Sequence, residues 1–150
     1  MANGSLPNVD LARRAVDFFL KDGWSMAQAA GLIANIEAES DFDPQAFGDG
    51  GDAFGICQWH PPRQAIFREA FGLSMRDADY DAQLAFVAFE LRNDEIRAGN
   101  ALRKATSAED AGAIVCKFYE RPLDLGGHER QRRGRRALLW FNEFAHSAEV

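Results

Sequence analysis

Acidic side chains frame the stretch of this sequence that is richest in glycine. Glu37 and Glu39 lie at the end of a segment with helical periodicity, and Asp49 and Asp52 lie within and just after the run Gly48–Gly51. Cleavage of a glycosidic bond requires two carboxyl groups: a protonated one donates to the leaving oxygen, and an ionised one activates water or stabilises positive charge on the sugar. The two environments must push their pKa values apart. A helix end beside a glycine-rich turn offers two such environments.

Position favours Glu39 over Glu37 as the acid. The two glutamates flank opposite edges of the apolar stripe of their helix, so periodicity does not separate them. Glu39 is closer to the C-terminus of the helix, where the dipole disfavours a negative charge and raises the pKa of a carboxyl group. We therefore predict Glu39 as the protonated acid and Asp49 as the ionised partner, with Asp52 as second candidate. The alternatives are a surface acid at a helix end and turn-forming aspartates. A calcium EF-hand is not supported, because no bidentate glutamate follows at the required position.

The hydrophobic pattern of the sequence predicts the helices and turns that would position these acidic residues. Apolar residues recur at helical spacing through most of the chain, whereas residues 41–60 break the pattern with aspartate, proline and glycine, which is typical of tight turns. We expect an α+β fold, predominantly helical, with six or more helices and a small β-hairpin near residues 46–58. Residues 1–150 are predicted to form a single domain. Asn8 and Ser25 are the expected caps of the first two helices, and Ser25 with Gln28 forms a predicted capping box. The expected helices cover residues 9–21, 26–40, 63–71, 79–93, 95–103, 108–119 and 129–145.

Composition excludes several classes of protein. A chain of 150 residues with 47% hydrophobic side chains can close the core of one ordinary domain, which argues against disorder. No apolar run approaches the roughly 18 residues of a membrane span, and the first residues do not resemble a signal peptide. Cys57 and Cys116 are expected to be buried thiols. No metal site and no cofactor are predicted, because His60, His128 and His146 stand apart from ligands at zinc-like spacing.

Five arginines fall within residues 128–136: Arg130, Arg132, Arg133, Arg135 and Arg136. They could contact phosphates of nucleic acid or an anionic cell envelope, or they could form the solvated face at the start of an otherwise buried helix. We favour the solvated face, with weak envelope contact as the alternative. A sequence pI near 5.0 does not indicate a nucleic-acid partner.

Three segments of the sequence carry a resemblance to a known family. They are Ala29–Ser40, which ends in Glu39-Ser40, then Gly48–His60 with its Gly-Asp-x-Gly and Phe-Gly-Ile-x-Gln pattern, and Tyr119–Pro122. Together they resemble the phage tail lysozyme and endolysin family, distant relatives of goose-type lysozymes and lytic transglycosylases. The resemblance is strong over residues 24–63 and looser elsewhere.

The resemblance implies a lysozyme-like fold and roles for particular residues. Glu39 would protonate the β-1,4 bond between N-acetylmuramic acid and N-acetylglucosamine, and Asp49 would hold or deprotonate the attacking water. Goose-type enzymes have a further aspartate two residues after the glutamine of the motif, and His60 stands there in this sequence, which leaves Asp49 or Asp52 as the second carboxylate. The other residues that the resemblance places at the substrate are Ser40, Asp52, Phe54, Gly55, Gln58, Trp59 and Tyr119.

The function predicted from the sequence is a peptidoglycan hydrolase, a muramidase that acts with inversion of configuration. The nearest alternative is a lytic transglycosylase, which needs only the glutamate because the 6-hydroxyl of the sugar replaces water. A non-catalytic envelope-binding or structural part of a phage tail is the alternative from another class. The expected partner is the glycan strand of peptidoglycan. We expect synthesis in the host cytoplasm and delivery to the cell wall by a holin or as part of a virion.

Overall fold

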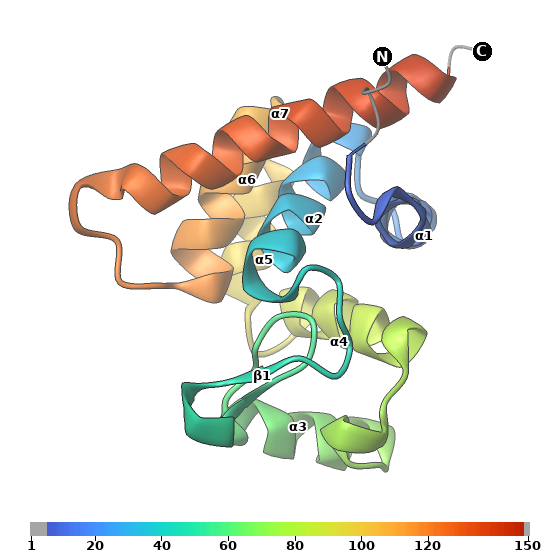
Figure 1. The fold of residues 1–150 in the computed structure, drawn as a ribbon, viewed down its shortest axis with the longest axis vertical. Helices are drawn as coiled ribbons and strands as arrows, with labels where there is room; N and C mark the ends of the chain where they lie inside the picture. The colour runs from blue at the N-terminus through green and yellow to red at the C-terminus, as the bar shows by residue number, and fades with distance from the viewer. Residues whose placement is uncertain (1–5, 149–150) are drawn as a thin grey trace.

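The computed structural model describes residues 6–148 of the chain and the side chains of residues 6–145. Within this part, the chain forms α-helices and one small antiparallel hairpin, in which Phe47 lies opposite Phe54. The predominantly helical α+β fold predicted from the sequence is thus confirmed (Figure 1). The helices are α1 (Val9–Lys21), α2 (Met26–Ser40), α3 (Pro61–Phe71), α4 (Tyr80–Arg92), α5 (Ile96–Arg103), α6 (Ala108–Ile114) and α7 (His128–Ala148), and the strands are β1 (Phe47–Gly48) and β2 (Ala53–Phe54). Short turns lie between these elements: the 3-10 turns η1 (Asp49–Gly51), η2 (Met75–Asp77) and η4 (Leu125–Gly127), and the π turn η3 (Val115–Glu120).

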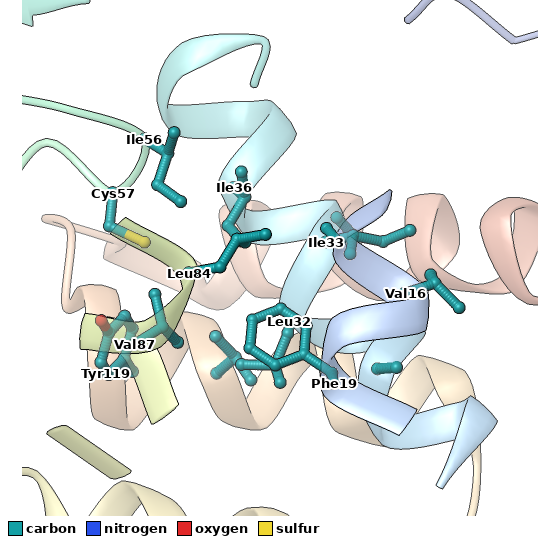
Figure 2. Close-up of a cluster of buried hydrophobic side chains, with 14 of the residues drawn as sticks. Val16, Phe19, Leu32, Ile33, Ile36, Ile56, Cys57, Leu84, Val87 and Tyr119 are labelled. Carbon is teal, nitrogen blue, oxygen red and sulfur yellow. The ribbon is translucent and has the colours of Figure 1, made fainter. Parts of the chain in front are cut away.

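Helix α2 is the centre of the core. It packs against α1, α6 and α7, and its residues from Ala29 to Ile36 are all buried, so it is covered on every side rather than along one stripe. Figure 2 shows Leu32, Ile33 and Ile36 of α2 among the other side chains of this cluster. The contact with α6 is close, because a Cβ atom at Gly31 would lie 2.5 Å from the carbonyl carbon of Ala111. A buried helix of this kind fixes where its last turn, with Glu39, stands.

The chain leaves α2 and descends to a second group of elements. In Figure 1, α2, α6 and α7 occupy the upper part, whereas the hairpin and α3 lie in the lower part. Two consecutive residues in the left-handed region, Asp41 (φ 56°) and Phe42 (φ 66°), end α2 and turn the chain downward. Trp59 and Phe86 join the lower group to α4, with ring centroids 5.2 Å apart. The end of α2 therefore belongs to the upper group of elements and the hairpin to the lower group, and the two lie at the boundary between the groups.

The predicted capping pattern is confirmed in part. Ser25 and Gln28 form the reciprocal capping box, with bonds of 2.9 and 3.1 Å, and Ser107 caps α6. The predicted cap at Asn8 is wrong, because Asn8 adopts a left-handed backbone (φ 60°) and its side chain donates instead to the carbonyl of Asp41. A capping side chain requires an extended backbone at that position.

Three helices differ from the prediction by more than one residue at an end. Helix α3 begins at Pro61, where proline suits the first turn because that turn has N–H groups without intrahelical partners. The helix predicted over residues 108–119 is α-helical only to Ile114 and continues as a wider π turn to Glu120. Helix α7 extends from His128 to Ala148. No helix among residues 6–148 has the length and apolar character to cross a membrane.

Candidate active site

A pocket of about 500 Å³ opens between the end of α2, the hairpin, the start of α3 and the end of η3. Three of the residues predicted for the site, Glu39, Asp49 and Gln58, line it together. His60, Arg63 and Glu120 line the same pocket. The structure thus brings together side chains as far apart in the sequence as Glu39 and Glu120, and two of the predicted carboxyl groups are among them.

The surroundings of Glu39 raise the pKa of its carboxyl group. Its side chain is 19% exposed, and its Oε2 atom lies 3.0 Å from Nη1 of Arg133. Burial raises the pKa of Glu39, the ion pair with Arg133 opposes part of this effect, and the charges of Glu129 and Asp49 add to it. In the structure, burial rather than the helix dipole predicted from the sequence is the main cause of the raised pKa of Glu39.

Glu37 is engaged elsewhere. Both of its carboxylate oxygens accept hydrogen bonds from Arg136, from Nε and Nη2, at 2.7 Å each. Its Oε1 also accepts a bond from the indole of Trp140 at 2.9 Å. This bidentate pair ties α2 to α7 and leaves the Glu37 carboxylate occupied. Of the two glutamates, Glu39 alone lines the pocket with Asp49.

Asp49 stands at the rim of the pocket on the turn η1. Its side chain is 68% exposed, and its Oδ2 atom lies 2.8 Å from Nε2 of His60. The turn needs glycine, since Asp49, Gly50 and Gly51 all have positive φ angles of 51°, 68° and 99°. His60 is therefore the direct partner of the second predicted carboxylate.

Gln58 holds the hairpin in shape as well as lining the pocket. Its Nε2 group donates to the carbonyls of Ala46 and Gly55, at 3.0 Å each. A Cβ atom at Gly48 would lie 2.7 Å from Oε1 of Gln58, so the absence of a side chain at Gly48 makes room for this amide. The predicted contact of Gln58 with substrate stays a prediction beside this structural role.

Ser40, Asp52 and Gly55 lie around the hairpin. Ser40 donates to the carbonyl of Ile56 at 2.8 Å and so ties the end of α2 to the loop after β2. Asp52 has an exposed side chain, and its backbone carbonyl accepts a bond from Gln64. Gly55 is buried with φ 90°, and a Cβ there would lie 2.8 Å from Oε1 of Gln83. These contacts support the loop that carries Asp49.

The aromatic residues predicted to meet the sugar are buried. Trp59 is 0% exposed, Tyr119 1% and Phe54 5%. The indole of Trp59 and the hydroxyl of Tyr119 both donate to Oε1 of the fully buried Glu90, which also pairs with Arg63. Contact with a sugar would require these side chains to leave the core, so the geometry supports a structural role for them.

Glu120 is a carboxyl group that the sequence reasoning missed. It lines the pocket, and its buried Oε2 atom has no hydrogen-bond partner among the described residues. Burial raises the pKa of Glu120 well above its usual range, and the charge of Glu39 adds to the effect. Residues Tyr119–Pro122 were part of the family resemblance, but the sequence alone gave no reason to place their glutamate beside Glu39.

Both cysteines are free and buried, as predicted. Cys57 lies at the pocket, and burial raises the pKa of its thiol well above its usual range. Because the thiolate is the nucleophilic form, this environment does not suit a cysteine nucleophile. Among the described residues, no group of three or more His, Cys, Asp and Glu side chains could hold a metal ion.

Most of the arginine-rich segment is engaged within the protein. Arg130 pairs with Asp124, Arg132 with Glu129, Arg133 with Glu39 and Glu129, and Arg136 with Glu37. The predicted solvated face is therefore wrong for Arg133, which is 6% exposed because it lies against α2. The expectation that the rest of this helix is buried does not hold for Leu138 and Leu139, which are 37% and 49% exposed. Envelope contact by this segment stays a prediction.

Two other hollows of similar volume lie along α7. One is lined by Glu109, Gly127 and Arg135, and the other by Glu37, Arg136 and Leu139. Their charged groups are arginines beside acids, and the Glu37 carboxylate is already occupied by Arg136. We place the candidate site in the pocket of Glu39, because a half-buried acid faces a second carboxylate there.

Comparison with known protein families shows to which family the chain belongs. A family model described as phage tail lysozyme matches residues 10–144. The chain belongs to the phage tail lysozyme family. The match includes all of the pocket residues named above, and it supports a lysozyme-like function related to peptidoglycan. A search of curated proteins found no match.

Proposed function

We propose that this phage tail lysozyme family member is a muramidase that cleaves the β-1,4 bond between N-acetylmuramic acid and N-acetylglucosamine. The observation that carries the proposal is the half-buried Glu39 carboxyl group, which shares a pocket with Asp49. Because burial raises the pKa of Glu39, this group holds a proton at a pH where an exposed glutamate has lost it. Glu39 is thus the general acid that protonates the leaving oxygen.

Asp49 is the group that activates water in this proposal. Its exposed position at the pocket rim gives water access to the carboxylate, and His60 holds that carboxylate from the other side. Attack by a water on the face opposite the leaving group inverts the configuration at the anomeric carbon. NMR of the first products therefore tests this step: the α-anomer is expected, and the β-anomer would contradict inversion.

Substitution of Glu39 tests the role of the acid, with Glu37 as the matched control. Glu39→Gln is expected to lower the rate of peptidoglycan cleavage by about 10²- to 10⁴-fold, the usual contribution of a general acid. Glu37→Gln removes a carboxylate two residues away that does not line the pocket, and should retain cleavage when assayed below its unfolding temperature. Equal rates for the parent and Glu39→Gln would contradict the proposal.

The exposure of Asp49 and its bond to His60 favour one second candidate, a lytic transglycosylase. Such an enzyme needs no second carboxylate, because the 6-hydroxyl of the muramic sugar attacks in place of water. Asp49→Asn separates the two reactions. A muramidase that uses Asp49 as its base loses cleavage in this variant, whereas a transglycosylase retains it and releases 1,6-anhydro products.

Family membership also supports a proposal on delivery. We infer that the chain reaches the cell wall as part of a virion or from within the cell as an endolysin, and the family's description as a phage tail lysozyme is the observation that bears on the choice. We favour the virion. Mass spectrometry of purified particles is expected to find the chain, and its absence from particles together with its accumulation before lysis would favour the endolysin.

A further inference from the structure

Helix α7 directs two of its arginines at the two glutamates of α2. Arg136 binds Glu37, and Arg133 lies 3.0 Å from Glu39. The two arginines differ in burial, since the side chain of Arg133 is 7% exposed and that of Arg136 is 31% exposed. The glutamates differ less, since the side chain of Glu39 is 19% exposed and that of Glu37 is 11% exposed, so it is the arginine of the Glu39 pair that is the more shielded from water.

The position of Arg133 is fixed independently of Glu39. Its Nη1 group donates to Oδ1 of the buried Asn35 at 3.0 Å. The Asn35 amide in turn donates to the carbonyls of Gly31 and Gly112, at 2.8 and 3.0 Å. Through Asn35, the guanidinium is tied to the backbones of α2 and α6 by contacts that do not involve Glu39.

Arg133 is also shared with a second acid. Its Nε group donates to Oε2 of Glu129 at 2.8 Å, one helical turn away on α7. Glu129 therefore competes with Glu39 for one buried positive charge. A guanidinium has five N–H donors, so Arg133 can bind both carboxylates at once, but its single positive charge is shared between them.

We propose that Arg133 is a positioning residue for Glu39, and that Glu129 limits the hold of Arg133 on that carboxyl group by sharing its guanidinium. The proposal rests on the function proposed above, in which Glu39 is the general acid. Arg133 fixes the orientation of the Glu39 carboxyl group. Glu129 reduces the effect of the Arg133 charge on that group, so Glu39 keeps its proton more readily.

The charges around Glu39 come from several elements. Arg133 and Glu129 face it from α7, Asp49 from η1 and Glu120 from the end of η3. Arg133 lowers the pKa of Glu39, whereas Glu129 and Asp49 raise it. Removal of Arg133 and removal of Glu129 should therefore move the pKa of Glu39 in opposite directions.

The pH dependence of kcat/KM on soluble glycan fragments tests the proposal, because its alkaline limb reports the general acid of the free enzyme. Arg133→Met is expected to move the alkaline midpoint to higher pH, and Glu129→Gln to lower pH. Arg133→Lys, which keeps the positive charge, should restore the midpoint toward that of the parent. Arg136→Met is the matched control, since Arg136 pairs with Glu37, and it should leave the midpoint unchanged.

A second readout does not depend on activity. A ¹³C NMR titration of labelled glutamate carboxyl carbons, with Glu39 assigned by its loss in Glu39→Gln, follows the same group without substrate. Opposite shifts in Arg133→Met and Glu129→Gln support the proposal, and if Arg133→Met does not fold, a downward shift in Glu129→Gln still supports it. An unmoved Glu39 titration in Glu129→Gln overturns it. A parent that cleaves no peptidoglycan while these shifts occur overturns the proposed function and leaves the charge arrangement standing.

Discussion

Glu39 and Glu120 are neighbouring carboxyl groups in one pocket, and they are held in different ways. Glu39 has Arg133 at 3.0 Å, whereas the buried Oε2 of Glu120 has no hydrogen-bond partner among the described residues. Burial and the charge of Glu39 raise the pKa of Glu120 and outweigh the opposing effects of Arg63, Arg133 and a hydrogen bond with Cys57. The neutral form of Glu120 is therefore favoured to a higher pH than in an exposed glutamate. The pocket can thus contain two buried carboxyl groups without two buried negative charges.

The protonated state of Glu120 makes stability depend on pH. Because the pKa of Glu120 in the folded protein is raised well above 4.5, the unfolded chain loses this proton first as pH rises. Stability is then lost from about pH 4.5 upward, by about 1.4 kcal/mol per pH unit until the folded pKa is reached. Glu120→Gln removes this loss. Urea unfolding of both proteins from pH 4 to pH 7 should show the variant gaining on the parent, and a constant difference would contradict a protonated Glu120.

At the scale of elements, close backbone contacts place α7 over α2 and α6. A Cβ atom at Gly112 would lie 2.6 Å from the carbonyl oxygen of Arg133 and 2.9 Å from Cα of Gly134. Both of those are backbone atoms, so the clash can be relieved only by moving a helix. The glycine of α6 therefore sets the distance at which Arg133 approaches the end of α2.

Gly112→Ala is expected to lower the free energy of unfolding by about 1–3 kcal/mol, the usual cost of overpacking. Ala65→Ser is the control, because it adds one atom at an exposed position of α3 and should change stability by about 0.5 kcal/mol or less. Thermal and urea unfolding measure both. If the two variants have the same stability, α6 and α7 are not in the close contact described.

The elements themselves could be predicted from the sequence more fully than their contacts. The helices over residues 9–21 and 26–40, and the capping box of Ser25, follow from local periodicity and local hydrogen bonds, and the structure has them at those bounds. The π turn after Ile114 and the pairing of Arg133 with Glu39 depend on helices that meet only in the folded chain. Local patterns predict an arginine-rich helix face, but they do not indicate which helix that face meets.

At the scale of the molecule, one buried cluster connects both groups of elements. It includes Ala15 of α1, Ile36 of α2, Ile56 after the hairpin, Leu84 of α4 and Trp140 of α7. Figure 2 shows Ile56, Ile36 and Leu84 close together where the two parts meet. The pocket of Glu39 lies across this junction, so its geometry depends on both parts remaining packed.

This continuity predicts a single unfolding transition. Trp140 packs against Phe42 and Phe144 beside α2, whereas Trp59 packs against Phe86 beside α4. In Trp140→Phe, the fluorescence reports only Trp24 and Trp59. For the parent and for this variant, the midpoint of unfolding by tryptophan fluorescence should coincide with the midpoint by circular dichroism at 222 nm measured on the same protein. Separate midpoints for fluorescence and circular dichroism would show that the two groups unfold independently, and would contradict the prediction of one domain.

The central claim is that Glu39 and Asp49 together hydrolyse peptidoglycan. Mass spectrometry of the muropeptides released from purified peptidoglycan by the parent, Glu39→Gln and Asp49→Asn tests it most directly. The account predicts fragments with reducing muramic acid ends from the parent, and a loss of roughly two or more orders of magnitude in rate from each variant. Anhydro-muramic ends, or full activity of Asp49→Asn, would contradict the two-carboxylate hydrolysis, and an absence of cleavage by the parent would contradict the enzyme altogether.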